Sequence, residues 1–115
     1  MKSNCKLIFS ILLLCILMLL TACGTTTITE NDGPPAAVLE AQAWLGMHLG
    51  ASVEEIRIVS MEQVEWTDSC FGLGGAAEIC AAEITPGWRA YFEINGLQYE
   101  VRFNETGTIA RSPQL

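Results

Sequence analysis

The chain has 115 residues, of which 13 are acidic and six are basic, and its formal net charge at pH 7 is −7. A chain this acidic repels the phosphate backbone, which argues against a nucleic-acid-binding protein. It also repels anionic lipid, so the folded part is not expected to bind a membrane surface through a charged patch.

The first 22 residues have the pattern of an export signal. Two lysines precede an apolar run over residues 7–20, which is too short for a membrane span and ends in small residues. Leu20-Thr21-Ala22-Cys23 resembles the lipobox of bacterial lipoproteins. This resemblance implies that residues 1–22 are a signal peptide, that Cys23 carries acyl chains such as palmitate, and that the protein is anchored in the cell membrane or outer membrane with its domain on the extracytoplasmic side. An uncleaved membrane anchor is the alternative.

Residues 23–36 are predicted to be the lipidated cysteine and a flexible linker, because they are polar and end in Gly-Pro-Pro. Residues 37–115 then form one small domain. Cleavage before Cys23 leaves four arginines against 13 acidic residues, a net charge of −9. A core of this size is marginally stable and often depends on a covalent crosslink.

The domain is expected to begin with a helix over residues 35–49. Apolar residues at helical spacing support it: Val38, Ala41, Leu45 and Leu49. Pro35 suits the start of a helix, and Gly50 can close its last turn. Ser52 and Glu55 match the capping-box pattern, which predicts one further short helical turn.

The rest of the chain is expected to form strands. Thr85-Pro86-Gly87 is interpreted as a turn, and Asn95-Gly96 as the turn of a hairpin. The predicted strands lie over residues 56–59 with 64–66, near 80–84, and over 88–94, 97–103 and 108–111. The fold class is therefore α+β, with one helix packed on a four- to five-stranded antiparallel meander sheet.

The two-residue turn fixes the register of the hairpin. One face carries four apolar pairs, which the helix should cover: Trp88 with Phe103, Ala90 with Val101, Phe92 with Tyr99, and Ile94 with Leu97. The register also places Arg89 opposite Arg102 on the solvent face, next to the pair of Tyr91 and Glu100.

Two like charges directly opposite each other are unfavourable and need an anion. In one interpretation, Glu93 or Glu100 supplies it from a diagonal position. In the other, Arg89, Arg102 and Tyr91 bind a carboxylate or phosphate of a partner, because arginine offers forked donors.

Cys70 and Cys80 are the only cysteines after Cys23. An exported domain permits disulfides, so we expect a bridge that closes the Gly- and Ala-rich loop between them. A redox pair is the functional alternative, although such pairs usually have C-x-x-C spacing. A zinc site from both cysteines and His48 meets no known ligand spacing, and no metal or cofactor is expected.

A pattern across the middle of the chain resembles an uncharacterised family of small exported bacterial domains. It runs W-x-D-x-C-x-G over residues 66–72, then Cys80-Ala81, then T-P-G-W-R over residues 85–89. The resemblance covers about residues 37–111 and implies a domain boundary and no activity. Asn104-Glu105-Thr106-Gly107 gives a weaker likeness to PepSY-type domains, which would imply peptidase-inhibitory or propeptide-like roles.

Other candidate residues each have an ordinary structural interpretation. Glu65 and Asp68 could form a catalytic carboxylate pair, or a strand edge and a turn. His48 has no nucleophile partner in any local signature and suits a helix surface. The three tryptophans could line a ligand cleft or build the core: Trp44, Trp66 and Trp88.

The sequence therefore favours a non-enzymatic, membrane-tethered extracytoplasmic binding or interaction module. Its expected partners are the membrane, through the acyl chains on Cys23, and an envelope protein. A protease-inhibitor or propeptide-like regulator of an envelope peptidase is the alternative. A small hydrolase or redox enzyme is the third class considered, and no catalytic residues are identified for it.

Overall fold

The computed structural model describes residues 33–115. The predicted signal peptide, Cys23 and most of the predicted linker lie outside the described residues. Between residues 33 and 115, no helix has the length and apolar character needed to cross a membrane.

Helix α2 (Ala36–Leu49) starts and ends within one residue of the prediction. Its buried face has the predicted periodicity and consists of Ala37, Val38, Ala41, Gln42, Leu45 and Gly46. Gly50 ends the helix in the left-handed conformation, with φ +64°, which glycine adopts without strain.

The predicted helical turn is a short 3₁₀ helix, η2 (Val53–Glu55), and the backbone N–H of Ser52 donates to the Glu55 carboxylate over 2.8 Å. The side chain of Gln42 on α2 donates to the carbonyl oxygens of Val53 (3.3 Å) and Ile56 (2.7 Å). This buried amide fixes the end of η2 against the helix, because its donors would otherwise be unsatisfied.

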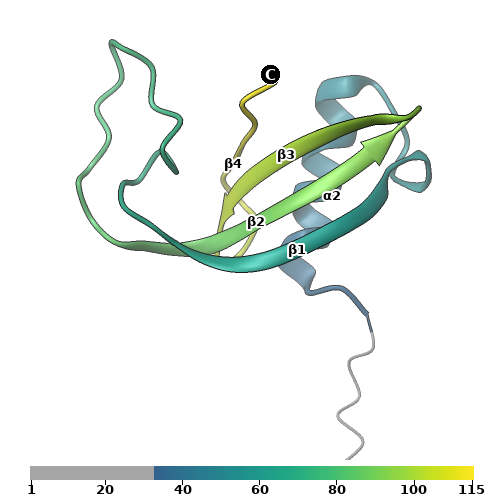
Figure 1. Ribbon diagram of the computed structural model, residues 1–115, viewed down its shortest axis with the longest axis horizontal. Helices are drawn as coiled ribbons and strands as arrows, with labels where there is room; N and C mark the ends of the chain where they lie inside the picture. The colour runs from purple at the N-terminus through teal and green to yellow at the C-terminus, as the bar shows by residue number, and fades with distance from the viewer. Residues whose placement is uncertain (1–32) are drawn as a thin grey trace, which may run out of the picture. The chain divides into compact units, whose positions relative to one another are not determined.

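Four antiparallel strands follow in the order β1-β2-β3-β4, as Figure 1 shows. They are β1 (Arg57–Trp66), β2 (Thr85–Ile94), β3 (Leu97–Asn104) and β4 (Ala110–Arg111). One helix on a four-stranded antiparallel sheet confirms the α+β prediction. β1 is one continuous strand of ten residues with an irregularity between Ile58 and Ser60.

The hairpin of β2 and β3 has the predicted register at every pair, including Arg89 with Arg102 and Tyr91 with Glu100. Asn95 and Gly96 both have positive φ, +51° and +78°. A tight hairpin turn needs this conformation at both central residues, which is why Asn-Gly specifies it.

Two predictions in this part of the chain are wrong. Residues 80–84 form no strand, and Thr85-Pro86-Gly87 is the start of β2 and not a turn, paired with Trp66, Glu65 and Val64 of β1. β3 begins to pair with β2 only at Gly87, so Pro86 has a neighbouring strand on one side alone. Proline lacks an N–H and is tolerated in a strand at such a position.

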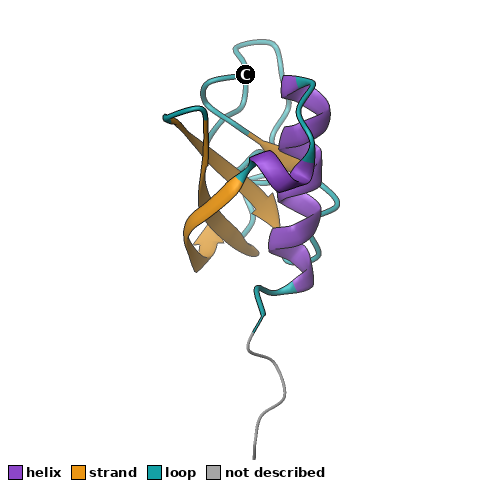
Figure 2. Cartoon of the chain, turned by 90° about the vertical axis from the view of Figure 1, so that its right-hand side faces the viewer, coloured by secondary structure: helices purple, strands orange, loops and turns teal. Residues whose placement is uncertain are grey.

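The helix covers one face of the sheet, as Figure 2 shows. Fully buried side chains there come from the helix and from both hairpin strands: Val38, Ala41, Leu45, Ala90, Phe92, Val101 and Phe103. Leu97 differs from the prediction, because it lies at the tip of the hairpin and is 60% exposed. The opposite surface of the sheet is called the far face below.

Candidate functional site

A long loop joins β1 to β2 and extends beyond the end of the sheet in Figure 1. Cys70 and Cys80 are joined there, with their sulfur atoms 2.05 Å apart, as the sequence analysis expected. One carboxylate oxygen of Asp68 accepts hydrogen bonds from the N–H groups of Cys70 (2.8 Å) and Gly72 (3.1 Å). Asp68 is therefore engaged in shaping the turn.

Trp66, the last residue of β1, is buried on the far face next to Phe71 of the loop, with their ring centroids 5.9 Å apart. Gly87 makes this position possible. A Cβ atom on Gly87 would lie 2.9 Å from Nε1 of Trp66 and 2.1 Å from the carbonyl oxygen of Phe103. The glycine of the T-P-G-W-R pattern is thus required by the close approach of an indole and a neighbouring strand.

Three of the four arginines lie side by side on the far face. The pairing of strands puts Arg89 on β2 beside Arg102 on β3, and Arg102 beside Arg111 on β4. We call these three residues the arginine row.

Each arginine of the row forms an ion pair with a glutamate of the same chain. Arg89 contacts Glu62 of β1 at 3.0 Å, and Arg102 contacts Glu100 at 2.6 Å. Arg111 forms a bidentate ion pair with Glu78 of the loop, in which both Nη atoms donate to the carboxylate and Nη1 lies 2.9 Å from Oε2. The hydrogen bonds from Arg111 and from the backbone of Gly75 hold the pKa of Glu78 below its usual range, and Glu78 in turn raises the pKa of Arg111.

The face that carries Arg89 and Arg102 was expected to be open to solvent, which is wrong. The guanidinium carbons of Arg89 and Arg102 lie 5.2 and 5.3 Å from the centre of the Trp66 ring, at cation–π distance. Arg102 also donates to the carbonyl oxygen of Phe71 over 2.9 Å. The two side chains are only 31% and 22% exposed, because Trp66 and the disulfide loop cover this part of the sheet.

Glu93 and Glu100 were the two glutamates expected to neutralise Arg89 and Arg102, and Glu100 is the one that does so. It lies between the two arginines, with Nε of Arg89 at 3.5 Å, close enough for an ion pair but without hydrogen-bond geometry. Glu93 contacts Arg57 instead. Within residues 33–115 the chain itself supplies the opposing charge, and capture of a partner's anion by Arg89, Arg102 and Tyr91 stays a prediction.

His48 stands apart from the cysteines. Its Nδ1 lies 2.8 Å from the carbonyl oxygen of Trp44, and the two rings are tilted against each other with their centroids 4.1 Å apart. Among the described residues, Asp68, Cys70 and Cys80 have possible metal-ligand atoms within 4.8 Å of one another, and His48 does not belong to this group. The two sulfur atoms are bonded to each other, so the zinc site considered above does not assemble.

The three tryptophans do not share one cleft. Trp66 belongs to the far face, whereas Trp44 and Trp88 pack against the core on the helix side. Trp44 lines a shallow depression of about 200 Å³ together with His48, Leu73 and Leu115. Trp88 lines another, which is described next.

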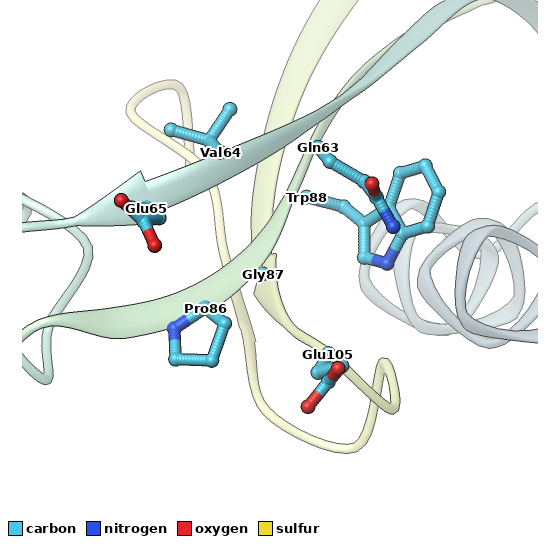
Figure 3. A pocket seen from close by; sticks show the side chains of 7 residues that line it. All are labelled: Gln63, Val64, Glu65, Pro86, Gly87, Trp88 and Glu105. Atoms are coloured by element: carbon cyan, nitrogen blue, oxygen red, sulfur yellow. The ribbon is translucent and has the colours of Figure 1, made fainter.

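A depression of about 270 Å³ opens beside β1, and Figure 3 shows the side chains around it. It is lined by Gln63, Val64 and Glu65 of β1, by Pro86, Gly87 and Trp88 of β2, and by Glu105 of the turn after β3. Glu65 of the proposed carboxylate pair thus lies here, while Asp68 is held in the loop.

Sequence reasoning found Arg89 and Arg102 but missed the residues that complete their surroundings: Glu62, Trp66, Phe71, Glu78 and Arg111. Only Arg111 had a usable signal, because it lies in the strand predicted over residues 108–111. The observed register sets it beside Arg102, whereas the contacts of the loop depend on tertiary packing.

The comparisons with known proteins give a family and no activity. A family described as Domain of unknown function (DUF8738) matches residues 38–112. Neither the curated proteins nor the solved structures contain a match to the chain. The likeness to PepSY-type domains stays a prediction. The family match covers the helix from Val38 onward, all four strands and the disulfide loop, and the chain belongs to this family of domains of unknown function.

Proposed function

We propose that this protein is a non-enzymatic binding module, anchored by lipid on the extracytoplasmic side of a bacterial membrane, and that it binds its partner along the free edge of β1. One observation carries the binding site: β1 is a long edge strand whose outer side pairs with nothing among the described residues. The anchor is supported by the lipobox pattern at Cys23.

The edge of β1 is unusually accessible. Seven of its ten residues are exposed, including Val59 (41%) and Met61 (43%). Natural proteins usually protect such an edge with lysine, proline, a bulge or a short strand. β1 has no lysine or proline and is ten residues long, and its one irregularity lies near its start, between Ile58 and Ser60, so that residues 61–66 form a regular edge. An extended segment of a partner can add to an edge of this kind through main-chain hydrogen bonds.

Two groups that a hydrolase could use make structural contacts. His48 Nδ1 lies against the carbonyl oxygen of Trp44, and Asp68 accepts two backbone hydrogen bonds. These contacts support a binding role over a hydrolytic one.

A regulator of an envelope peptidase is the second candidate, and the disulfide loop favours it. Ile79 is 97% exposed, and both of its neighbours are tied to other parts of the domain, Cys80 by the disulfide and Glu78 by its ion pair with Arg111. A loop constrained in this way loses less entropy on binding than a free one, which suits insertion of its apolar side chain into a protease subsite. Ile79→Asp should then abolish inhibition of the target peptidase and leave binding at β1 unchanged.

Site-specific photo-crosslinking tests the β1 site. A benzophenone amino acid at Met61, in cells making the full chain, should give a discrete adduct with an envelope protein. The matched control is the same group at Met47 on α2, which is 77% exposed. Equal adducts at both positions, or none at Met61, would contradict the proposal.

Metabolic labelling tests the anchor separately. The full chain should incorporate an alkyne-tagged palmitate in bacterial cells, and Cys23→Ser should abolish both labelling and processing. Cys15→Ser, in the apolar run, is the matched control and should label normally. Persistent labelling of Cys23→Ser would overturn the lipid anchor without bearing on the β1 edge.

A further inference from the structure

We infer that the segment received by the β1 edge is an extended basic peptide, and that one lysine or arginine of it reaches into the depression beside β1. The inference rests on the proposed function, and it specifies the chemistry of the partner. The depression is lined by one indole and two carboxylates, and three of its lining residues belong to β1.

The depression lies on the helix side of the sheet. Gln63 pairs with Trp88 and Glu65 with Pro86, so the four side chains share a face, and Trp88 packs against the core. Figure 3 shows the Trp88 ring on one side of the depression, with Glu65 and Glu105 on its other sides. Trp88 therefore offers an aromatic surface close to two acidic groups.

Within residues 33–115, no ion pair neutralises the carboxylates around this depression. All four arginines of residues 33–115 contact glutamates elsewhere: Glu62, Glu78, Glu93 and Glu100. Glu65 and Glu105 make no ion pair in this part of the chain, and both are exposed. A cation next to an indole and two carboxylates gains from both kinds of contact.

The geometry of strand addition selects a long side chain. A strand added to β1 lies about 4.8 Å beyond it, so its backbone is about 10 Å from β2, where Trp88 stands. A side chain on the helix face of the added strand must pass Gln63 or Glu65 to reach the indole. Lysine and arginine combine that length with a positive charge, and their apolar stems suit contact with Trp88 and Pro86.

Charge also decides between a basic peptide and a second copy of this chain. The described residues contain four basic and 11 acidic side chains, a net charge of −7. Two copies would each bring this net negative charge to the interface, with Glu62 and Glu65 on the pairing strand, and repulsion between like charges opposes their association. A basic segment instead neutralises this surface.

Selection from a displayed library of random heptapeptides on the full chain, held in detergent, tests the inference. The selected peptides should be enriched in lysine or arginine at one position, with β-branched or aromatic residues at alternate positions. On the Glu65→Gln/Glu105→Gln variant this enrichment should disappear, and a selected peptide should bind about tenfold more weakly. The control variant Glu54→Gln/Glu83→Gln changes the net charge by the same amount at sites outside the depression. It should retain both the enrichment in basic residues and the affinity for the selected peptide.

The outcomes separate the inference from the proposed function. Selected peptides without basic residues that still block the Met61 crosslink would overturn the basic-peptide inference and leave β1 as the binding edge. An equal loss of peptide affinity in the two double variants would show a general effect of net charge, and this result would also overturn the basic-peptide inference. Failure to select any peptide while Met61 still forms its adduct would exclude a short extended segment as the ligand. Absence of that adduct contradicts the proposed function itself.

Discussion

The two faces of the sheet are stabilised in different ways. The helix face is closed by apolar side chains, such as Leu45 and Phe92, that exclude water. The far face is closed by Trp66, two arginines and a disulfide loop, through contacts that each require one type of residue. An apolar core accepts exchanges of similar volume, whereas removal of an indole, a glycine or a guanidinium leaves the far face incomplete.

This difference explains the pattern over residues 66–89. Trp66 and Gly87 meet on the far face, Asp68 shapes the turn, Cys70 and Cys80 close the loop, and Arg89 lies against the indole. A Cβ on Gly72, with φ +70°, would also lie 3.2 Å from the Arg102 guanidinium. The pattern is a set of structural requirements of the far face, and the proposed binding edge lies outside most of it.

Phe92→Ala should have the largest effect. Phe92 is fully buried on the helix face, so its truncation should lower the free energy of unfolding by about 3–5 kcal/mol. Chemical denaturation of the full chain measures this. Phe71→Ala, on the far face, should cost less, because Phe71 lies outside the core cluster under the helix. A reversed order would contradict the proposed difference between the faces.

Loss of the disulfide should come next. Cys70→Ser with Cys80→Ser should lower the free energy of unfolding by about 2–3 kcal/mol, because the bridge restricts the unfolded loop. Hydrogen exchange should show the loss of protection concentrated at Ser69 and Phe71, whose N–H groups are bonded within the loop. A uniform loss of hydrogen-exchange protection over β2 and β3 would mean that the two faces of the sheet do not contribute independently to stability.

Gly87→Ala should destabilise the far face by about 1–3 kcal/mol, since the new methyl group overlaps the Phe103 carbonyl and the Trp66 indole. The loss of stability is measured by thermal unfolding, and the change at the far face by the NMR signal of the Trp66 indole N–H. Gly75→Ala is the matched control, because a Cβ there meets nothing within 4 Å. Equal melting temperatures for the two variants would refute the close-approach argument.

Acid should have the smallest effect, because Glu78 is exposed and Arg111 is only partly buried, so water screens their ion pair. The pKa of Glu78 is lowered from about 4.5, so its contribution to stability is present above that pH and is lost as the pH falls through the lowered value. The Gly75 amide signal, which reports its bond to Glu78, should shift in that range. In Glu78→Gln the shift should vanish, and its persistence would assign the titration to another group.

The helix and the hairpin could be predicted because their signals are local. Helical spacing fixed α2, and Asn95-Gly96 with alternation on both sides fixed every pair between β2 and β3. The opposition of Arg89 and Arg102 followed from that register alone.

The far face and the depression could not be predicted in the same way. Thr85-Pro86-Gly87 has the residues of a turn, and only the indole of Trp66 explains why Gly87 stands inside a strand. Glu65 and Glu105 are 40 residues apart and meet because β1 and the turn after β3 border one depression. Contacts of this kind depend on the assembled sheet and leave no local periodicity.

The exposed edge of β1 also bears on the behaviour of the protein in concentrated samples. A long strand without lysine or proline is a site for edge-to-edge aggregation. The irregularity between Ile58 and Ser60 interrupts its hydrogen-bonding edge, and the acidic surface keeps copies apart at low ionic strength. Salt at about 1 M shortens the Debye length to about 3 Å and removes that repulsion. Colloidal stability should therefore fall with added salt, and crystallisation screens at high ionic strength should favour lattices or fibres joined through β1.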